Sequence, residues 1–281
     1  MSDANQSPPP DEPAAPAGEA PGPEKPASMP PTSMPWANWL RDFWLVLGFF
    51  TRLPVVSVTG HLGEAARAFP LAGLVVGLIG AFVYFVAMEI GLSGLLAALL
   101  AVAATGIVTG ALHEDGWADV CDALGARGGV EKRLEILRDS RLGSFGGLAL
   151  IFATSIKVAA IANLGAPELV AGALVAAHTL ARGVLPLVMS RMTLARSNGL
   201  AADAGRPTQS AANWSLIIAL LFAVLAVAPI AALVALLAAL AATWLVGKLA
   251  QKKFGGYTGD VLGAVEQVAE MAILINLVTL T

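Results

Sequence analysis

The densest run of charge in the chain lies between His113 and Arg141, where seven acidic and five basic residues occur. Within it, Asp115, Asp119 and Asp122 recur at spacings of four and three, so on a helix their carboxylates share one face. Three like charges on one face repel each other unless a cation lies between them. Clustered carboxylates are typical ligands of hard divalent ions such as Mg²⁺, which are frequently shared with substrate phosphates. The spacing favours a metal site, and the alternative is a solvated acidic helix face.

The composition indicates what kind of protein positions these carboxylates. The chain has 281 residues, of which 57% are hydrophobic and 13% charged, and its mean hydropathy is +0.73. A soluble domain of this size carries about 25% charged residues. The formal net charge of −3 gives no indication of a nucleic-acid partner, and the single cysteine, Cys121, excludes an internal disulfide. We therefore predict an all-α, polytopic membrane helix bundle.

The first 35 residues differ from the rest, because they hold eleven of the seventeen prolines. Such a segment buries too little apolar surface to fold. It also lacks the basic and apolar regions of a signal peptide. We predict a disordered tail over residues 1–35 and a membrane-embedded domain over residues 36–281.

Apolar runs of membrane thickness predict six spans and a candidate seventh. The expected spans are Ala68–Met88, Ile90–Leu112, Leu142–Asn163, Leu169–Ser190, a hairpin of two spans over Ala211–Gly247, and the candidate Val261–Leu280. Gly73, Gly77 and Gly80 predict close helix packing in the first span. Pro229 marks the turn of the hairpin.

The basic residues predict the orientation of these spans. Lys and Arg occur in every second connection, and the connections between them, at Glu89, Pro167–Glu168 and Pro229, contain none. By the positive-inside rule, the basic connections face the cytoplasm. The acidic stretch and the segment Phe254–Asp260 are therefore both expected on the cytoplasmic side of the membrane.

Further polar residues flank the aspartates or interrupt apolar segments. His113 is a candidate general base or substrate donor, and Arg141, beside Asp139, is a candidate phosphate ligand. Glu266 is an intramembrane carboxylate four residues before a second one, Glu270, and such groups need a metal or an arginine as partner. Other candidates are the basic residues Arg52 and Arg182 and the turn Thr258, Gly259 and Asp260.

These groups together indicate metal-assisted phosphoryl transfer at the membrane. A divalent ion neutralises charge on a diphosphate and positions an incoming hydroxyl. The sequence contains no P-loop, no Gly-x-Ser-x-Gly motif and no dinucleotide-binding fingerprint.

The motifs of the chain resemble those of the cobalamin synthase family, also called adenosylcobinamide-GDP ribazoletransferases. The resemblance runs from about Trp39 to the C-terminus and is carried, in the same order, by Thr51–Val55, Phe69–Gly73, Thr109–Asp122, Leu134–Gly143, Ala181–Gly183 and Thr258–Ala264. Glu114, Trp117 and Ala123 depart from the family pattern, but none of these departures removes a carboxylate.

The resemblance implies a late step of vitamin B12 assembly. A hydroxyl of α-ribazole, or of its 5′-phosphate, attacks the phosphate on the cobinamide arm of adenosylcobinamide-GDP, and GMP leaves. It also implies an integral inner-membrane enzyme that needs Mg²⁺. The partners we expect are these substrates and a lipid bilayer, with no nucleic acid and a homo-oligomer left open.

Site roles follow as hypotheses. The expected metal ligands are Asp115, Asp119, Asp122, Asp139, Asp260 and Glu266. The expected catalytic groups are His113, Asp115, Asp119, Asp122 and Asp139, with His113 assisting the attacking hydroxyl. The expected substrate-binding residues are Arg52, Arg141, Arg182, Thr258 and Gly259.

Two other functions remain open from the residues alone. A CDP-alcohol phosphotransferase also carries spaced aspartates, but its pattern places an acidic residue three positions before Asp-Gly, where this chain has Leu112. A cation-coupled transporter is suggested by Glu266 and Glu270, although the two halves of the chain show no inverted repeat.

Overall fold

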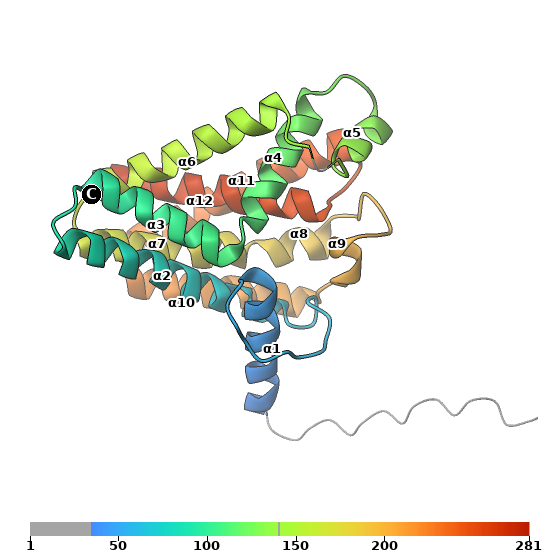
Figure 1. Cartoon of the computed structure of the whole chain (residues 1–281). Helices are drawn as coiled ribbons and strands as arrows, with labels where there is room; N and C mark the ends of the chain where they lie inside the picture. Colours follow the sequence, from blue (N-terminus) through green and yellow to red (C-terminus); the bar gives the residue numbers. More distant parts are fainter. Residues whose placement is uncertain (1–34, 140, 281) are drawn as a thin grey trace, which may run out of the picture. The chain divides into compact units, whose positions relative to one another are not determined.

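The computed structural model describes residues 35–139 and 141–280, and these residues form helices joined by turns and loops (Figure 1). The predicted tail lies outside the described residues, except for Pro35. The helices are α1 (Pro35–Phe50), η1 (Ala66–Ala68), α2 (Phe69–Glu89), α3 (Gly94–Thr109), α4 (Leu112–Gly125), α5 (Val130–Ile136), α6 (Ser144–Leu164), α7 (Pro167–Gly183), α8 (Leu185–Arg191), α9 (Leu200–Asp203), α10 (Gln209–Ala226), α11 (Pro229–Phe254) and α12 (Gly259–Leu280). The described part of the chain contains no β-strand, and the all-α prediction is confirmed.

Six helical segments within the described residues are long and apolar enough to cross a membrane. They are Ala66–Glu89, Ser144–Leu164, Pro167–Arg191, Gln209–Ala226, Pro229–Phe254 and Gly259–Leu280. The shortest has 18 residues, or about 27 Å at 1.5 Å per residue, close to the thickness of the hydrocarbon core. The predicted hairpin is confirmed, because α10 ends at Ala226 and Pro229 begins α11.

The second predicted span is wrong as an uninterrupted helix. Instead of Ile90–Leu112, the structure has the 16-residue helix α3, which bends by 91° into α4. The bend occurs at Gly110 and Ala111, which both adopt left-handed backbone conformations, with φ of 64° and 55°. Left-handed residues cannot continue a right-handed helix, and for alanine this conformation is unfavourable. The candidate seventh span falls within α12, which is one of the six long helices.

Helix α7 is the centre of the bundle. Every residue from 172 to 189, in α7 and the adjoining α8, is buried, and α2 packs along α7. A Cβ at Gly73 would collide with the carbonyl oxygen of His178, and one at Gly77 would lie 2.8 Å from that of Leu174. The backbones of α2 and α7 therefore touch where the glycine spacing predicts close packing.

The loops on the two sides of the bundle differ in charge, as expected from the sequence. In Figure 1 the α2–α3 turn, the α6–α7 turn and the end of α12 gather at one end of the long helices, and α5, α8 and α9 at the other. The second end carries the basic stretches 127–141 and 191–206. Figure 1 also shows α1 running across the direction of the long helices at the lower edge of the bundle.

We predict that Gly73→Ala destabilises the protein, because the added methyl group meets the backbone of α7. Overpacking of this kind costs about 1–3 kcal/mol. Gly106→Ala is the matched control, since nothing lies within 4 Å of a Cβ built there. The unfolding temperatures of the two purified variants measure these effects. Equal unfolding temperatures for Gly73→Ala and Gly106→Ala would contradict the packing described.

Candidate active site

The aspartate-bearing helix α4 packs against both α6 and α12. Its contact with α12 is made without an intervening side chain, because a Cβ at Gly116 would lie 2.9 Å from the Cα of Asp260. A Cβ at Gly263 would likewise lie 3.0 Å from the carbonyl oxygen of His113. This backbone-to-backbone crossing places the start of α12 beside the acidic face of α4.

Four carboxylates interact where the two helices cross. Asp119 is half-buried on α4, which turns away from α3 and is not one of the six long helices. Burial and the charges of Asp115, Asp260 and Asp122 raise the pKa of Asp119 to about 7. Since the charges of the other three carboxylates act on Asp119, we treat the four as one group and call it the acidic cluster. Carboxylate oxygens are the ligands that Mg²⁺ prefers, so the donor set fits the expected ion.

Asp122 has a second role in the structure. One of its oxygens accepts from the backbone N–H of Gly143 at 2.7 Å, and the other accepts from Gly146 at 2.8 Å. These donors belong to the first turn of α6 and the residue before it, whose exposed N–H groups favour a carboxylate. A Cβ at either glycine would collide with the Asp122 carboxylate. Asp122 thus fixes the start of α6 against α4.

Asp260 is held in place at the start of α12. The buried Thr258 hydroxyl donates to the Asp260 carboxylate at 3.0 Å and accepts from the N–H of Val261 at 3.3 Å. Arg196, from the loop after α8, lies 3.6 Å from the same carboxylate oxygen of Asp260. The predicted turn residues therefore orient one carboxylate of the cluster.

A pocket of about 140 Å³ adjoins the acidic cluster. Its polar lining groups are His113, Asp115, Arg196 and Asp260. Its apolar lining comes from six helices and the loops beside them. It comprises Phe49, Phe50, Leu62, Phe69, Leu112, Leu185, Met189, Leu200, Ala201, Ala204 and Leu262, with Gly116, Gly259 and Gly263 at the helix crossing.

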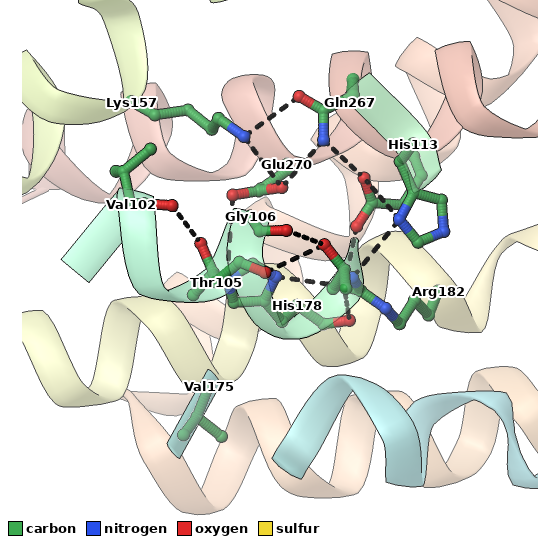
Figure 2. A network of polar contacts seen from close by, with 12 residues as sticks. Val102, Thr105, Gly106, His113, Lys157, Val175, His178, Arg182, Gln267 and Glu270 are labelled. Carbon is green, nitrogen blue, oxygen red and sulfur yellow. Dashed lines mark hydrogen bonds and ion pairs between the residues drawn. The ribbon is translucent and has the colours of Figure 1, made fainter. Parts of the chain in front are cut away.

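A second polar feature lies deeper in the bundle, and we call it the buried network (Figure 2). Lys157 of α6 donates to Gln267 at 3.0 Å and to Glu114 at 3.2 Å, and its Nζ lies 3.6 Å from Glu270. Arg182 of α7 lies 2.7 Å from Glu266. Both cations and the two α12 glutamates are almost completely buried. The network therefore joins α4, α6, α7 and α12 through paired charges.

His113 links the buried network to the pocket. Its Nδ1 lies 3.5 Å from Nη2 of Arg182 and 3.8 Å from Glu266, and its ring stacks on Phe50. A guanidinium only donates, so in the Arg182 contact Nδ1 accepts and a neutral ring carries its proton on Nε2. Nε2 is buried and has no hydrogen-bond partner among the described residues. His113 is therefore set to donate a hydrogen bond to a molecule in the pocket.

Glu266 belongs to the buried network and not to the acidic cluster. The charges acting on it are those of Arg182, Glu270, Glu114 and Lys157. Ligand atoms of His178, Glu266 and Glu270 lie within 4.8 Å of one another, close enough to hold a metal ion. However, Arg182 and Lys157 already supply positive charge to these two glutamates. From the sequence, either a metal or an arginine was expected as the partner of Glu266, and in the structure the partner is Arg182.

The remaining predicted residues lie outside the acidic cluster. Asp139, in the loop before α6, is bound by the Arg141 guanidinium, which lowers the pKa of that carboxyl to about 2. Arg141 is largely exposed. The Arg52 side chain lies against Gly110, and the backbone N–H of Arg52 donates to the Val108 carbonyl at 2.7 Å. Arg52 thus adjoins the bend between α3 and α4.

Two groups were missed from sequence: Lys157 in the network and Arg196 at the pocket. A lone lysine inside the apolar run Ser144–Leu164 is itself a signal, because an intramembrane charge needs a buried partner. Arg196 gave no comparable signal, since it is one of several basic residues in a loop.

Comparison with known proteins decides the family. The cobalamin-5-phosphate synthase family model matches residues 42–278. The chain belongs to this family. A relative from Bradyrhizobium diazoefficiens, named adenosylcobinamide-GDP ribazoletransferase, is 43% identical over 242 residues, which cover 85% of this chain and 93% of the relative.

Two further members of the family carry the same name. One from Mesorhizobium japonicum is 42% identical and covers 84% of this chain and 92% of the relative. One from Azorhizobium caulinodans is 39% identical and covers 84% and 95%. No solved structure matches the chain. The resemblance noted from the motifs is thereby confirmed for the family.

We predict that Lys157→Met destabilises the protein strongly, because it leaves the buried Glu270 and the partly buried Glu114 without their cation. Removing one partner of a buried ion pair lowers the free energy of unfolding by about 3–5 kcal/mol. The double variant Lys157→Met/Glu270→Gln should recover part of this loss. The unfolding temperature in detergent measures both changes.

The matched control for this prediction is Lys132→Met, which removes an ion pair of similar length, 2.9 Å to Glu135, on the exposed surface of α5. Exposed pairs contribute about 0–1 kcal/mol. If both lysine variants unfold at the same temperature, the network does not carry the stability assigned to it.

Proposed function

We propose that this protein joins adenosylcobinamide-GDP to α-ribazole, or to α-ribazole 5′-phosphate, and releases GMP. The observation that carries the proposal is the acidic cluster beside a largely apolar pocket, in a chain whose relatives at 39–43% identity are named adenosylcobinamide-GDP ribazoletransferases. Carboxylates that repel one another suit a metal bound with substrate phosphates, and the pocket offers a place for a small organic group. The proposed product is adenosylcobalamin or its 5′-phosphate.

Asp115, Asp119 and Asp260 are the proposed Mg²⁺ ligands. Asp122 contributes negative charge, but both of its oxygens already accept backbone hydrogen bonds. When bound by these residues, Mg²⁺ would neutralise charge on the diphosphate and stabilise the leaving phosphate. The roles of Asp139 as a metal ligand and catalytic group and of Arg141 as a phosphate ligand stay predictions. The exposed Arg141 guanidinium is the proposed contact for the GDP phosphates.

The reaction is a displacement at phosphorus. A ribose hydroxyl forms a new oxygen–phosphorus bond with the phosphate attached to the cobinamide arm, and the bond to the GMP phosphate breaks. The proton of the hydroxyl passes to a carboxylate of the acidic cluster. His113 donates from Nε2 to the reacting group at the end of the pocket, while Arg182 and Glu266 hold its Nδ1 edge. Pre-oriented donors of this kind stabilise charge that develops during the reaction.

The proposed location is the bacterial inner membrane, with the acidic cluster on the cytoplasmic side. Six long apolar helices support a multi-pass membrane protein. The basic stretches 127–141 and 191–206 lie at one end of the bundle and support the orientation by the positive-inside rule.

The test of the function is GMP release. The full-length protein in detergent is incubated with adenosylcobinamide-GDP and α-ribazole, with and without Mg²⁺. We expect GMP and a completed cobamide in equal amounts, and only with the metal present. Well-folded protein that releases no GMP under these conditions would contradict the assignment.

We predict that Asp119→Asn lowers kcat by at least about 100-fold, because it removes a central ligand of the proposed metal site. Mg²⁺ binding, measured by calorimetry on the same preparation, should weaken in parallel. Glu131→Gln is the control, since it makes the same chemical change on exposed α5. Unchanged Mg²⁺ affinity in the Asp119 variant would exclude this residue as a ligand.

A further inference from the structure

We propose that the pocket between α1, α4, α8, α9 and α12 is the binding site for the bicyclic aromatic base of α-ribazole, and that the GDP-bearing corrinoid binds outside it. The inference rests on the proposed function, because it divides the two substrates of that reaction between different parts of the site. The chemistry of the pocket walls, its unpartnered polar atoms and its size each support the assignment.

The walls of the pocket suit a flat apolar ring. Phe49, Phe50 and Phe69 line it together with Leu185 and Met189. Aromatic faces and a methionine sulfur both interact favourably with aromatic rings. An apolar base buried here gains about 25 cal/mol for each Å² removed from water. The pocket lining therefore offers aromatic and apolar contacts to a benzimidazole ring.

The polar groups of the pocket are arranged to meet a sugar and its reacting hydroxyl. His113 is almost completely buried, and its Nε2 has no partner among the described residues. Nη1 of Arg196 is also a buried atom without a hydrogen bond in the described structure. Buried polar atoms are nearly always satisfied, so these two indicate a ligand that supplies oxygen acceptors. Asp115 and Asp260 line the same pocket and belong to the acidic cluster.

A guanine base fits this pocket less well than a benzimidazole. Guanine has hydrogen-bonding groups along its edges, and burying them unpaired costs free energy. The polar side chains among the lining residues are His113, Asp115, Arg196 and Asp260, and the proposed reaction uses His113 and the two aspartates. No side-chain amide or hydroxyl is found among the lining residues. The lining thus favours the base with the fewest polar atoms.

The size of the pocket separates it from the corrinoid. Pockets for drug-sized ligands measure roughly 300–1,000 Å³. A pocket of about 140 Å³ accommodates one small ring system, but it does not accommodate a corrin macrocycle. The large substrate must therefore approach from outside and extend its diphosphate towards the acidic cluster.

The test uses Ala201→Phe, which places a ring inside the pocket from the short helix α9. Ala201 is buried and lines the pocket, whereas its neighbour Ala202 is not among the lining residues. Ala202→Phe is therefore the matched control, with the same added volume on the same helix. With the full-length protein, we expect Ala201→Phe to raise the KM for α-ribazole by at least about tenfold. The KM for adenosylcobinamide-GDP should stay within about twofold, and the control should behave as the unmodified protein.

Two results would overturn the inference. A rise in the KM for adenosylcobinamide-GDP instead of α-ribazole would assign the pocket to the guanine nucleotide. Unchanged KM values for both substrates would show that the pocket binds neither base. If Ala201→Phe does not fold, Leu62→Ala tests another lining residue under the same criteria, with an expected rise of roughly tenfold in the KM for α-ribazole alone.

Failure of the proposed function is a separate outcome. It is recognised when the unmodified protein releases no GMP. Equilibrium dialysis with α-ribazole alone then still tests the pocket: binding to the unmodified protein that Ala201→Phe weakens by about tenfold supports the pocket, and absent or unaltered binding overturns it.

Discussion

The structure depends on the pairing of charges inside an apolar helix bundle. Arg182 on α7 and Lys157 on α6 are buried among the glutamates of α4 and α12. A single charge buried in such surroundings is very unfavourable, whereas a pair with good geometry is tolerated. Each helix can therefore adopt only the position along its axis that brings its charged residue to a partner. The polar centre fixes how α4, α6, α7 and α12 are aligned, while the glycines of α2 and α4 determine how closely helices approach.

The same pairing prepares His113 for its role. The buried network contains three glutamates, Glu114, Glu266 and Glu270, but two permanent cations, Lys157 and Arg182. The Arg182–Glu266 pair occupies the Nδ1 side of His113, and Phe50 covers its face. The ring therefore has one nitrogen left for the pocket. The buried network therefore orients the Nε2–H donor of His113, and its own charged groups are buried away from water.

Much of this arrangement was predictable from the sequence, and the misses have physical causes. Helix content, the hairpin at Pro229 and the close packing at Gly73 follow from local rules that need no knowledge of neighbours. The bend at Gly110 and Ala111 does not follow from such local rules, because alanine rarely adopts a left-handed conformation. Such a conformation persists only where the surrounding structure enforces it, and here it sits between α3 and the acidic helix.

For the site, residue types were easier to predict than partners. Spacing placed Asp115, Asp119 and Asp122 on one face, and the structure groups them with Asp260. Spacing could not separate Asp122, which fixes the start of α6, from the carboxylates that have no such backbone contacts. Nor could it tell whether Glu266 faces a metal or an arginine, since both satisfy a buried carboxylate. Whether a polar side chain belongs to the pocket or to the network depends on which helices cross, which is a tertiary property.

The bend between α3 and α4 explains how one chain combines a largely apolar pocket with a charged reaction site. Without the bend, α4 would continue in the direction of α3. The 91° turn instead lays α4 across the start of α12, so that Asp115 and Asp119 meet Asp260 while the first turn of α4 contributes Leu112 and His113 to the pocket. One helix thus borders both environments. In the proposed reaction an apolar base is held on one side and a diphosphate on the other, and the bond forms where the two regions meet.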